Sequence, residues 1–125
     1  MPTGERGRMD DLAYFRDLYD AFNRRDVNGV LAMMTEDVNW PNAWKSGRLS
    51  GHDAVRDYWA EQWAEINPAV TPLSVTERGD GSLAVAVRQV VRSLDNEPLS
   101  DGVVVHVYKL RDGLIMRMDV EQPRR

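Results

Sequence analysis

The C-terminal stretch from Leu99 to Val120 constrains the fold more than any other part of the chain. It contains a run of valines, then Asp112-Gly113, then the alternating run LIMRMDV. β-branched residues fit the pleated surface of a strand, and an Asp-Gly pair between two such runs signals a tight hairpin turn. The sequence therefore predicts a β-hairpin as the last unit of the fold.

Two titratable residues interrupt this hairpin. His106 lies within the valine run, and Asp119 lies between two apolar residues. A buried imidazole or carboxylate costs free energy unless it is paired or used in chemistry. We expect both side chains to point into a water-poor hollow, where burial raises the pKa of Asp119 toward the range useful for proton transfer. Alternatively, Asp119 forms an ion pair with Arg117 or Arg88. In the same way, His106 is alternatively a hydrogen-bonded core histidine.

Length and composition exclude several functional classes. At 125 residues the chain is one domain of ordinary size, and its net charge of −4 argues against binding to a nucleic-acid backbone. The chain has no cysteine and only two histidines, which excludes Cys-based and His-rich metal sites. No apolar run approaches the ~20 residues that a membrane span needs. The charged N-terminus has no apolar segment of the signal-peptide type. We therefore expect a cytoplasmic protein with no metal, nucleic-acid or membrane partner.

Apolar residues recur at helical spacing in the N-terminal half of the chain. The expected helices cover residues 10–25, 27–35 and 50–66, and Asn67-Pro68 ends the last of them. A short strand is expected at 38–40. The segment that follows it is rich in Pro, Asn, Ser and Gly, which predicts a loop up to Leu49.

Beyond Pro68 the apolar pattern changes from helical spacing to alternation. Strands are predicted at 70–78 and 82–94, and together with the final hairpin they form a meander. Helices at the start and antiparallel strands at the end predict an α+β fold. We expect a cone-shaped barrel in which three N-terminal helices wrap a curved, mostly antiparallel sheet and leave a cavity at one end. Residues 1–8 are expected to form a flexible tail, and residues 9–122 a single domain.

The candidate ligand contacts come from the segments that would line or close this cavity. Aromatic walls suit a flat or polycyclic ligand. Tyr14 lies off the main apolar stripe of the first helix and is expected near the pocket mouth. Arg88 interrupts a long strand, and on the outer face of the sheet it would instead serve a dimer interface or solvent. The tryptophans in this set are Trp40, Trp44, Trp59 and Trp63. At helical spacing the last two are alternatively core or dimer contacts.

The order of these elements resembles the nuclear transport factor 2-like superfamily over nearly the whole chain. LYDAFNRRDVNGVLAMMTEDVNW is similar to its first two helices and entry strand, GHDAVRDYW to the start of its third helix, and VYKLRDGLIMRMDV to its last hairpin. Within the superfamily the chain is most similar to the SnoaL-like group, which includes polyketide cyclases. In this order and spacing the phrases are specific for the fold, and they say much less about the reaction.

The resemblance implies roles for particular residues. In SnoaL-like cyclases the position of His106 holds a pocket histidine, and that of Asp119 holds an aspartate that acts as general acid/base in an aldol ring closure. The related ketosteroid isomerases carry their base directly before a proline on the entry strand. Here that dipeptide is Trp40-Pro41, so the isomerase base is missing. The related limonene epoxide hydrolases use an Asp-Arg-Asp set, for which Arg88 and Asp119 supply two members.

We therefore expect a homodimeric pocket protein that binds a small apolar or aromatic metabolite. The expected chemistry needs no cofactor and is of the cyclase, isomerase or epoxide hydrolase type. Asp119 is the expected acid/base, and His106 the group that polarises a carbonyl or epoxide. The alternative is a non-catalytic ligand-binding or dimeric interaction domain of the same fold. A buried Asp119 near His106 favours the enzyme, and an Asp119 paired with arginine favours the alternative.

Overall fold

The computed structural model describes residues 8–42 and 46–122. Trp44 and all but the last residue of the expected tail therefore lie outside the described residues. Three helices and six strands are described, namely α1 (Arg8–Asn23), α2 (Val27–Leu31), β1 (Met34–Pro41), β2 (Arg48–Ser50), α3 (His52–Glu65), β3 (Ile66–Glu77), β4 (Leu83–Ser93), β5 (Pro98–Arg111) and β6 (Leu114–Glu121). None of the described helices is long and apolar enough to cross a membrane.

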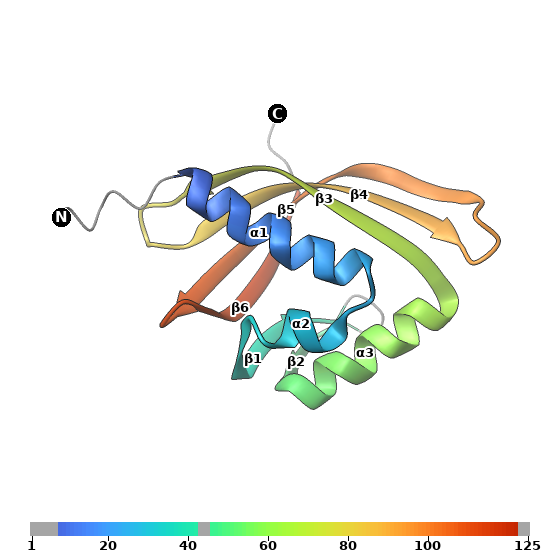
Figure 1. The fold of residues 1–125 in the computed structure, drawn as a ribbon, viewed down its shortest axis with the longest axis horizontal. Helices are drawn as coiled ribbons and strands as arrows, with labels where there is room; N and C mark the ends of the chain where they lie inside the picture. The colour runs from blue at the N-terminus through green and yellow to red at the C-terminus, as the bar shows by residue number, and fades with distance from the viewer. Residues whose placement is uncertain (1–7, 43–45, 123–125) are drawn as a thin grey trace.

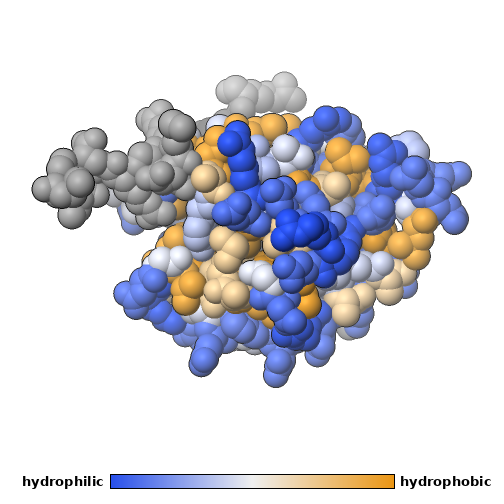
Figure 2. Space-filling model, viewed as in Figure 1, coloured by the Kyte–Doolittle hydropathy of each residue, from blue (hydrophilic) through white to orange (hydrophobic). Residues whose placement is uncertain are grey.

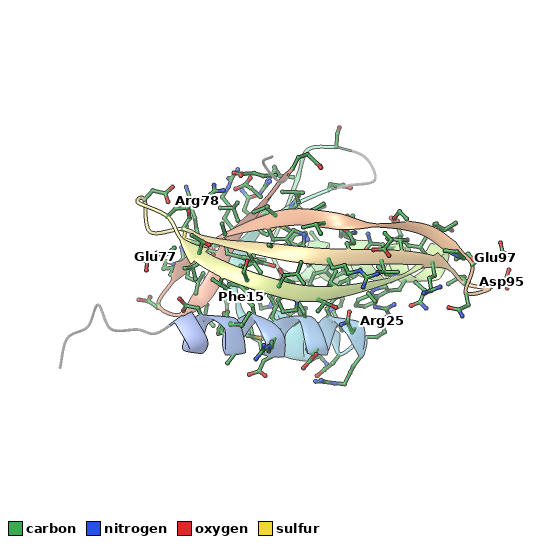
Figure 3. The ribbon with its side chains drawn as sticks, turned by 90° about the horizontal axis from the view of Figure 1, so that it is seen from above. Phe15, Arg25, Glu77, Arg78, Asp95 and Glu97 are labelled. Atoms are coloured by element: carbon green, nitrogen blue, oxygen red, sulfur yellow. The ribbon has the colours of Figure 1, made fainter. Side chains whose placement is uncertain are left out.

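The strands form one mixed sheet in the order β2-β1-β6-β5-β4-β3. Only the β1–β6 pair is parallel among the described pairings, and the others are antiparallel. The long strands β3, β4 and β5 span the length of the molecule, and α1 runs along one side of them (Figures 1 and 3). The described sheet is not closed. The expected α+β fold is confirmed, in the form of an open cone.

The expected hairpin is confirmed, including its turn. Asp112 and Gly113 both have positive φ, at 54° and 83°. Two consecutive residues with positive φ match the tight turn whose twist suits a hairpin.

Several segments differ from the prediction, and β1 is longer than the strand expected at 38–40. α2 ends at Leu31 rather than residue 35, because the carbonyl of Met33 already accepts a hydrogen bond from Ile115 in β6. β3 begins at Ile66, directly where α3 ends. β2 lies within the predicted loop, where it pairs with the end of β1. In each case pairing with another strand decided the backbone conformation, which the composition of the segment alone does not encode.

The core lies between the helices and the concave face of the sheet. Phe15 is fully buried and faces the sheet from α1 (Figure 3). Val85 and Val87 on β4, and Tyr108 on β5, are also fully buried. The surface seen in Figure 2 is mostly hydrophilic, with apolar patches between charged side chains. One side of the sheet and one stripe of each helix thus make a single core.

Candidate functional site

A cavity opens between α1, α3 and the concave face of the sheet. Its volume is about 340 Å³, which falls in the range of small-molecule sites. None of the described lining residues is charged. The apolar part of the wall includes Leu18, Phe22, Trp40, Trp59, Val70 and Met118. A cavity of this kind favours a neutral, largely apolar ligand.

The pairing of β5 with β6 determines which hairpin residues face the cavity. His106 pairs with Val120, and both line the cavity. Asp119 pairs with Val107, one position away. Directly opposite residues share a face of the sheet, and neighbours along a strand lie on opposite faces. His106 therefore points inward, and Asp119 points to the outer face.

A one-residue irregularity in the hairpin separates these two side chains. Next to the turn, Leu110 pairs with Ile115, but the following pair is Lys109 with Arg117, so Met116 is extra. Without that extra residue the pairing would continue to His106 opposite Asp119. A one-residue shift moves every later side chain to the other face. The expectation that both groups share one hollow therefore fails at this bulge.

Asp119 forms ion pairs on the outer face. One carboxylate oxygen lies 2.8 Å from Nε of Arg117, and the other lies 3.0 Å from Nη1 of Arg48. The hydrogen bonds from Arg117, together with the charges of both arginines, lower the pKa of Asp119. This is the reverse of the raised pKa that the hairpin sequence suggested. The structure corrects the expected placement of Asp119, and its catalytic role stays a prediction.

His106 is part of a hydrogen-bonded relay with two tyrosines. The hydroxyl of Tyr19 lies 2.9 Å from Nδ1 of His106 and 2.7 Å from the hydroxyl of Tyr108. Burial lowers the pKa of His106 to about 4 and raises the pKa of each tyrosine. At neutral pH the imidazole is therefore uncharged and both hydroxyls keep their protons.

The number of protons in the relay fixes its direction. If Tyr19 donated to Tyr108, the proton of the fully buried Tyr108 would have no acceptor among the described residues. Such a stranded donor costs about 1–3 kcal/mol. If Tyr108 donates to Tyr19 and Tyr19 donates to Nδ1 of His106, both hydroxyl protons form hydrogen bonds. A neutral imidazole that accepts at Nδ1 carries its own proton on Nε2. The relay thus gives His106 an Nε2–H donor, which has no partner among the described residues.

The aromatic residues that line the cavity are packed against further aromatic and charged side chains outside it. The ring of Trp59 packs edge-on against Trp40 at 5.5 Å and stacks on Trp63 at 5.9 Å. Trp40 and Trp59 line the cavity, whereas Trp63 is not among its described lining residues. The guanidinium of Arg25 lies 5.0 Å from the centre of the Trp63 ring and also bonds the side chain of Asn67. Trp63 thus supports the wall rather than forming its inner surface.

Two other candidate residues lie away from the cavity. The hydroxyl of Tyr14 is 3.3 Å from the carbonyl of Met33 and 3.2 Å from that of Gly113, so it links α1 to two turns. Arg88 makes two hydrogen bonds to Asp101, at 3.0 and 2.7 Å, and is exposed. Neither Tyr14 nor Arg88 is among the described lining residues. The expected placement of both at the pocket is corrected.

Sequence reasoning missed the polar partners of His106. Tyr19 lies at helical spacing among the apolar residues of the first helix, a pattern typical of a core residue rather than of a polar contact. Tyr108 follows His106 by two residues, and the period of a strand places both on one face. That spacing was the available signal for Tyr108. Among the described residues, no group of three or more His, Cys, Asp or Glu side chains is placed to hold a metal ion.

Comparisons with known proteins agree with this fold. A family model described as a SnoaL-like domain matches residues 15–118. An NTF2-like protein of unknown function from Burkholderia pseudomallei is 24% identical, with a TM-score of 0.76 over 90% of each chain. TerC, crystallised with polyporic acid, is 25% identical, with a TM-score of 0.76 over 90% of this chain and 91% of its own. A putative polyketide cyclase from Xanthomonas campestris is 20% identical, with a TM-score of 0.70 over 90% of each chain.

No curated protein gives a significant sequence match. The family match nevertheless covers most of the chain and includes β1, α3, His106 and the final hairpin as far as Met118. The structural neighbours share the fold that the sequence resemblance implies, and the family model confirms the resemblance to the SnoaL-like group. This chain belongs to the SnoaL-like family.

Proposed function

We propose that the protein binds a neutral, flat, apolar metabolite in this cavity and polarises one of its oxygens with the Nε2–H of His106. The observation that carries the proposal is the relay from Tyr108 through Tyr19 to His106, which ends in a donor at the cavity wall. The aromatic and uncharged lining supports the choice of ligand. The crystallisation of TerC with polyporic acid supports a small-molecule function for a chain of this fold.

The same donor suits a step in which negative charge develops on a carbonyl oxygen. Preorganised donors stabilise an enolate or alkoxide more than the ground-state carbonyl. An isomerisation or cyclisation also needs a base, and no carboxylate is present among the described lining residues. Asp119 could act there only after leaving Arg117 and Arg48. Ligand binding is therefore the preferred function, and a cyclase or isomerase of the SnoaL-like type is the second candidate.

A matched pair of ligands tests the proposal. Titration calorimetry compares 9-fluorenone, which has an acceptor oxygen, with fluorene, which has none. His106→Phe keeps an aromatic ring and removes the donor. We expect it to weaken fluorenone binding about fivefold, since a hydrogen bond contributes about 1 kcal/mol, and to leave fluorene binding unchanged. An equal effect on both ligands, or none on fluorenone, would contradict the proposed contact.

We also propose that a second copy of the chain covers the outer face of the sheet. Val105 pairs with Ala86, and Val103, which is 40% exposed, pairs with Arg88 on this face. The bidentate pair between Arg88 and Asp101 neutralises charge at the edge of this apolar strip. Sedimentation velocity tests the assembly. The dimer should dissociate in Ala86→Glu, and a wild-type protein that stays monomeric at high concentration would refute it.

A further inference from the structure

Gln89 gives the cavity a second polar end. It lies four residues beyond Val85 on β4, and Val85 pairs with His106 on β5. Four residues of a strand span about 13 Å, and an even separation keeps the side chains on one face. Gln89 and His106 both line the cavity. The imidazole and the amide therefore face the same space from positions far apart along the sheet.

The sheet surface between these two groups is apolar. Midway between them, Val87 on β4 pairs with Val104 on β5. Val87 is fully buried, and Val104 packs against the core. A ligand lying along this strip would have an apolar middle. Its polar groups would be satisfied only near the ends.

The amide of Gln89 has no hydrogen-bond partner among the described residues, and the same holds for Nε2 of His106. Gln62 on α3 also lines the cavity. The helix α3 leads directly into β3 at Ile66, and Ile66 pairs with Ser93, which lies beyond Gln89 on β4. Gln62 therefore lies toward the same end of the cavity as Gln89. An amide both donates and accepts, so this end suits a neutral hydroxyl or carbonyl.

This end of the cavity also leaves room for a larger ligand. Gln89 borders a second hollow of about 290 Å³, which Ser100 and Gln122 also line. The pairing of β6 with β5 ends at Val105, so the first part of β5 has no neighbour on that side among the described strands. A substituent on the ligand would extend past Gln89 into this hollow.

We infer that the ligand is an elongated neutral molecule with a hydrogen-bonding oxygen at each end. One end accepts from Nε2–H of His106, and the other bonds the amide of Gln89. A fused polycycle or a biaryl that carries oxygens at opposite ends has this shape. The inference rests on the proposed small-molecule function and adds Gln89 as the residue that selects for the second polar group.

The test compares 4-acetylbiphenyl with 4-acetyl-4′-hydroxybiphenyl, which differ only in the distal hydroxyl. In the wild type we expect the hydroxyl to tighten binding about three- to tenfold, the value of one neutral hydrogen bond. Gln89→Met keeps the length of the side chain and removes the amide. It should abolish this advantage and leave the affinity for 4-acetylbiphenyl unchanged. His106→Phe should weaken both ligands by the same factor.

Controls separate this inference from the proposed function. Asn28→Met changes an exposed amide on α2 that lines neither hollow, and it should behave as the wild type. A hydroxyl advantage that persists in Gln89→Met, or that is lost only in Gln62→Met, would overturn the role of Gln89 while ligand binding stands. If the distal hydroxyl does not tighten binding to the wild type, the role of Gln89 is likewise overturned while ligand binding stands. Failure of both biphenyls and of fluorenone to bind would contradict the proposed function itself.

Discussion

Removing the hydroxyl of Tyr19 should destabilise the protein more than removing the hydroxyl of Tyr108, although both changes delete a single oxygen. Tyr19 is the central member of the relay, because it contacts both His106 and Tyr108. Tyr19→Phe leaves the buried proton of Tyr108 without an acceptor and Nδ1 of His106 without a donor. Tyr108→Phe leaves only a spare acceptor site on Tyr19, which still donates to His106.

The magnitudes follow from the number of stranded groups. A buried polar group without its partner costs about 1–3 kcal/mol, so Tyr19→Phe should cost about 2–4 kcal/mol. Tyr108→Phe removes one neutral hydrogen bond and should cost about 1 kcal/mol. In the double variant the proton of Tyr108 is gone as well. We therefore expect the double variant to be no less stable than Tyr19→Phe alone.

Urea unfolding of the four proteins gives this double-mutant cycle. The slope of the free energy of unfolding against urea should stay constant, so that changes in midpoint report stability. The interaction energy between the two sites should be about 1–3 kcal/mol and favourable to the pair. Equal costs for the two single variants, or costs that add in the double variant, would refute the direction assigned to the relay.

Three further predictions concern pH, the outer face and an edge strand. Unfolded histidine binds a proton near pH 6.5 and folded His106 only near 4. The unfolded state therefore holds more protons in that window. Stability is complete above pH 6.5 and falls by up to about 3 kcal/mol toward pH 4. Urea titrations should show less of this loss in His106→Leu. Asp119→Asn should lower stability by less than about 1 kcal/mol, because the carboxylate is partly exposed, and leave ligand affinity unchanged in calorimetry. A large loss of turnover would instead restore its catalytic role. Asn23→Ala removes both hydrogen bonds from α1 to Val70 on β3 and should lower the free energy of unfolding by about 1–2 kcal/mol in urea titrations. No change would contradict this anchoring.

The fold was accessible from the sequence because its signals are local. The Asp112-Gly113 turn, the helical spacing of the first helix and the change of period after Pro68 each act over a few residues. β2 was missed because three residues pair with β1 without a distinctive composition. The side-chain period, rather than composition, indicates that Tyr108 shares a face with His106.

The sequence predicts only part of the candidate site correctly, and the main reason is the pairing register of the hairpin. The hairpin sequence predicts regular pairing from its two-residue turn, and regular pairing places His106 opposite Asp119. The extra residue Met116 places every later side chain of β6 on the opposite face of the sheet. The relay itself joins Tyr19 to Tyr108 across 89 positions of the chain, and no local pattern reports such a contact.

The protonation of the His106 imidazole is the most direct test of the central claim. Nitrogen-15 NMR of labelled histidine distinguishes Nδ1–H from Nε2–H, and a His52→Gln variant assigns the two signals. The account predicts a neutral ring with its proton on Nε2 at pH 7, unchanged on acidification to about pH 5, since the pKa lies near 4. A proton on Nδ1 at pH 7, or an imidazolium already present at pH 6, would contradict it.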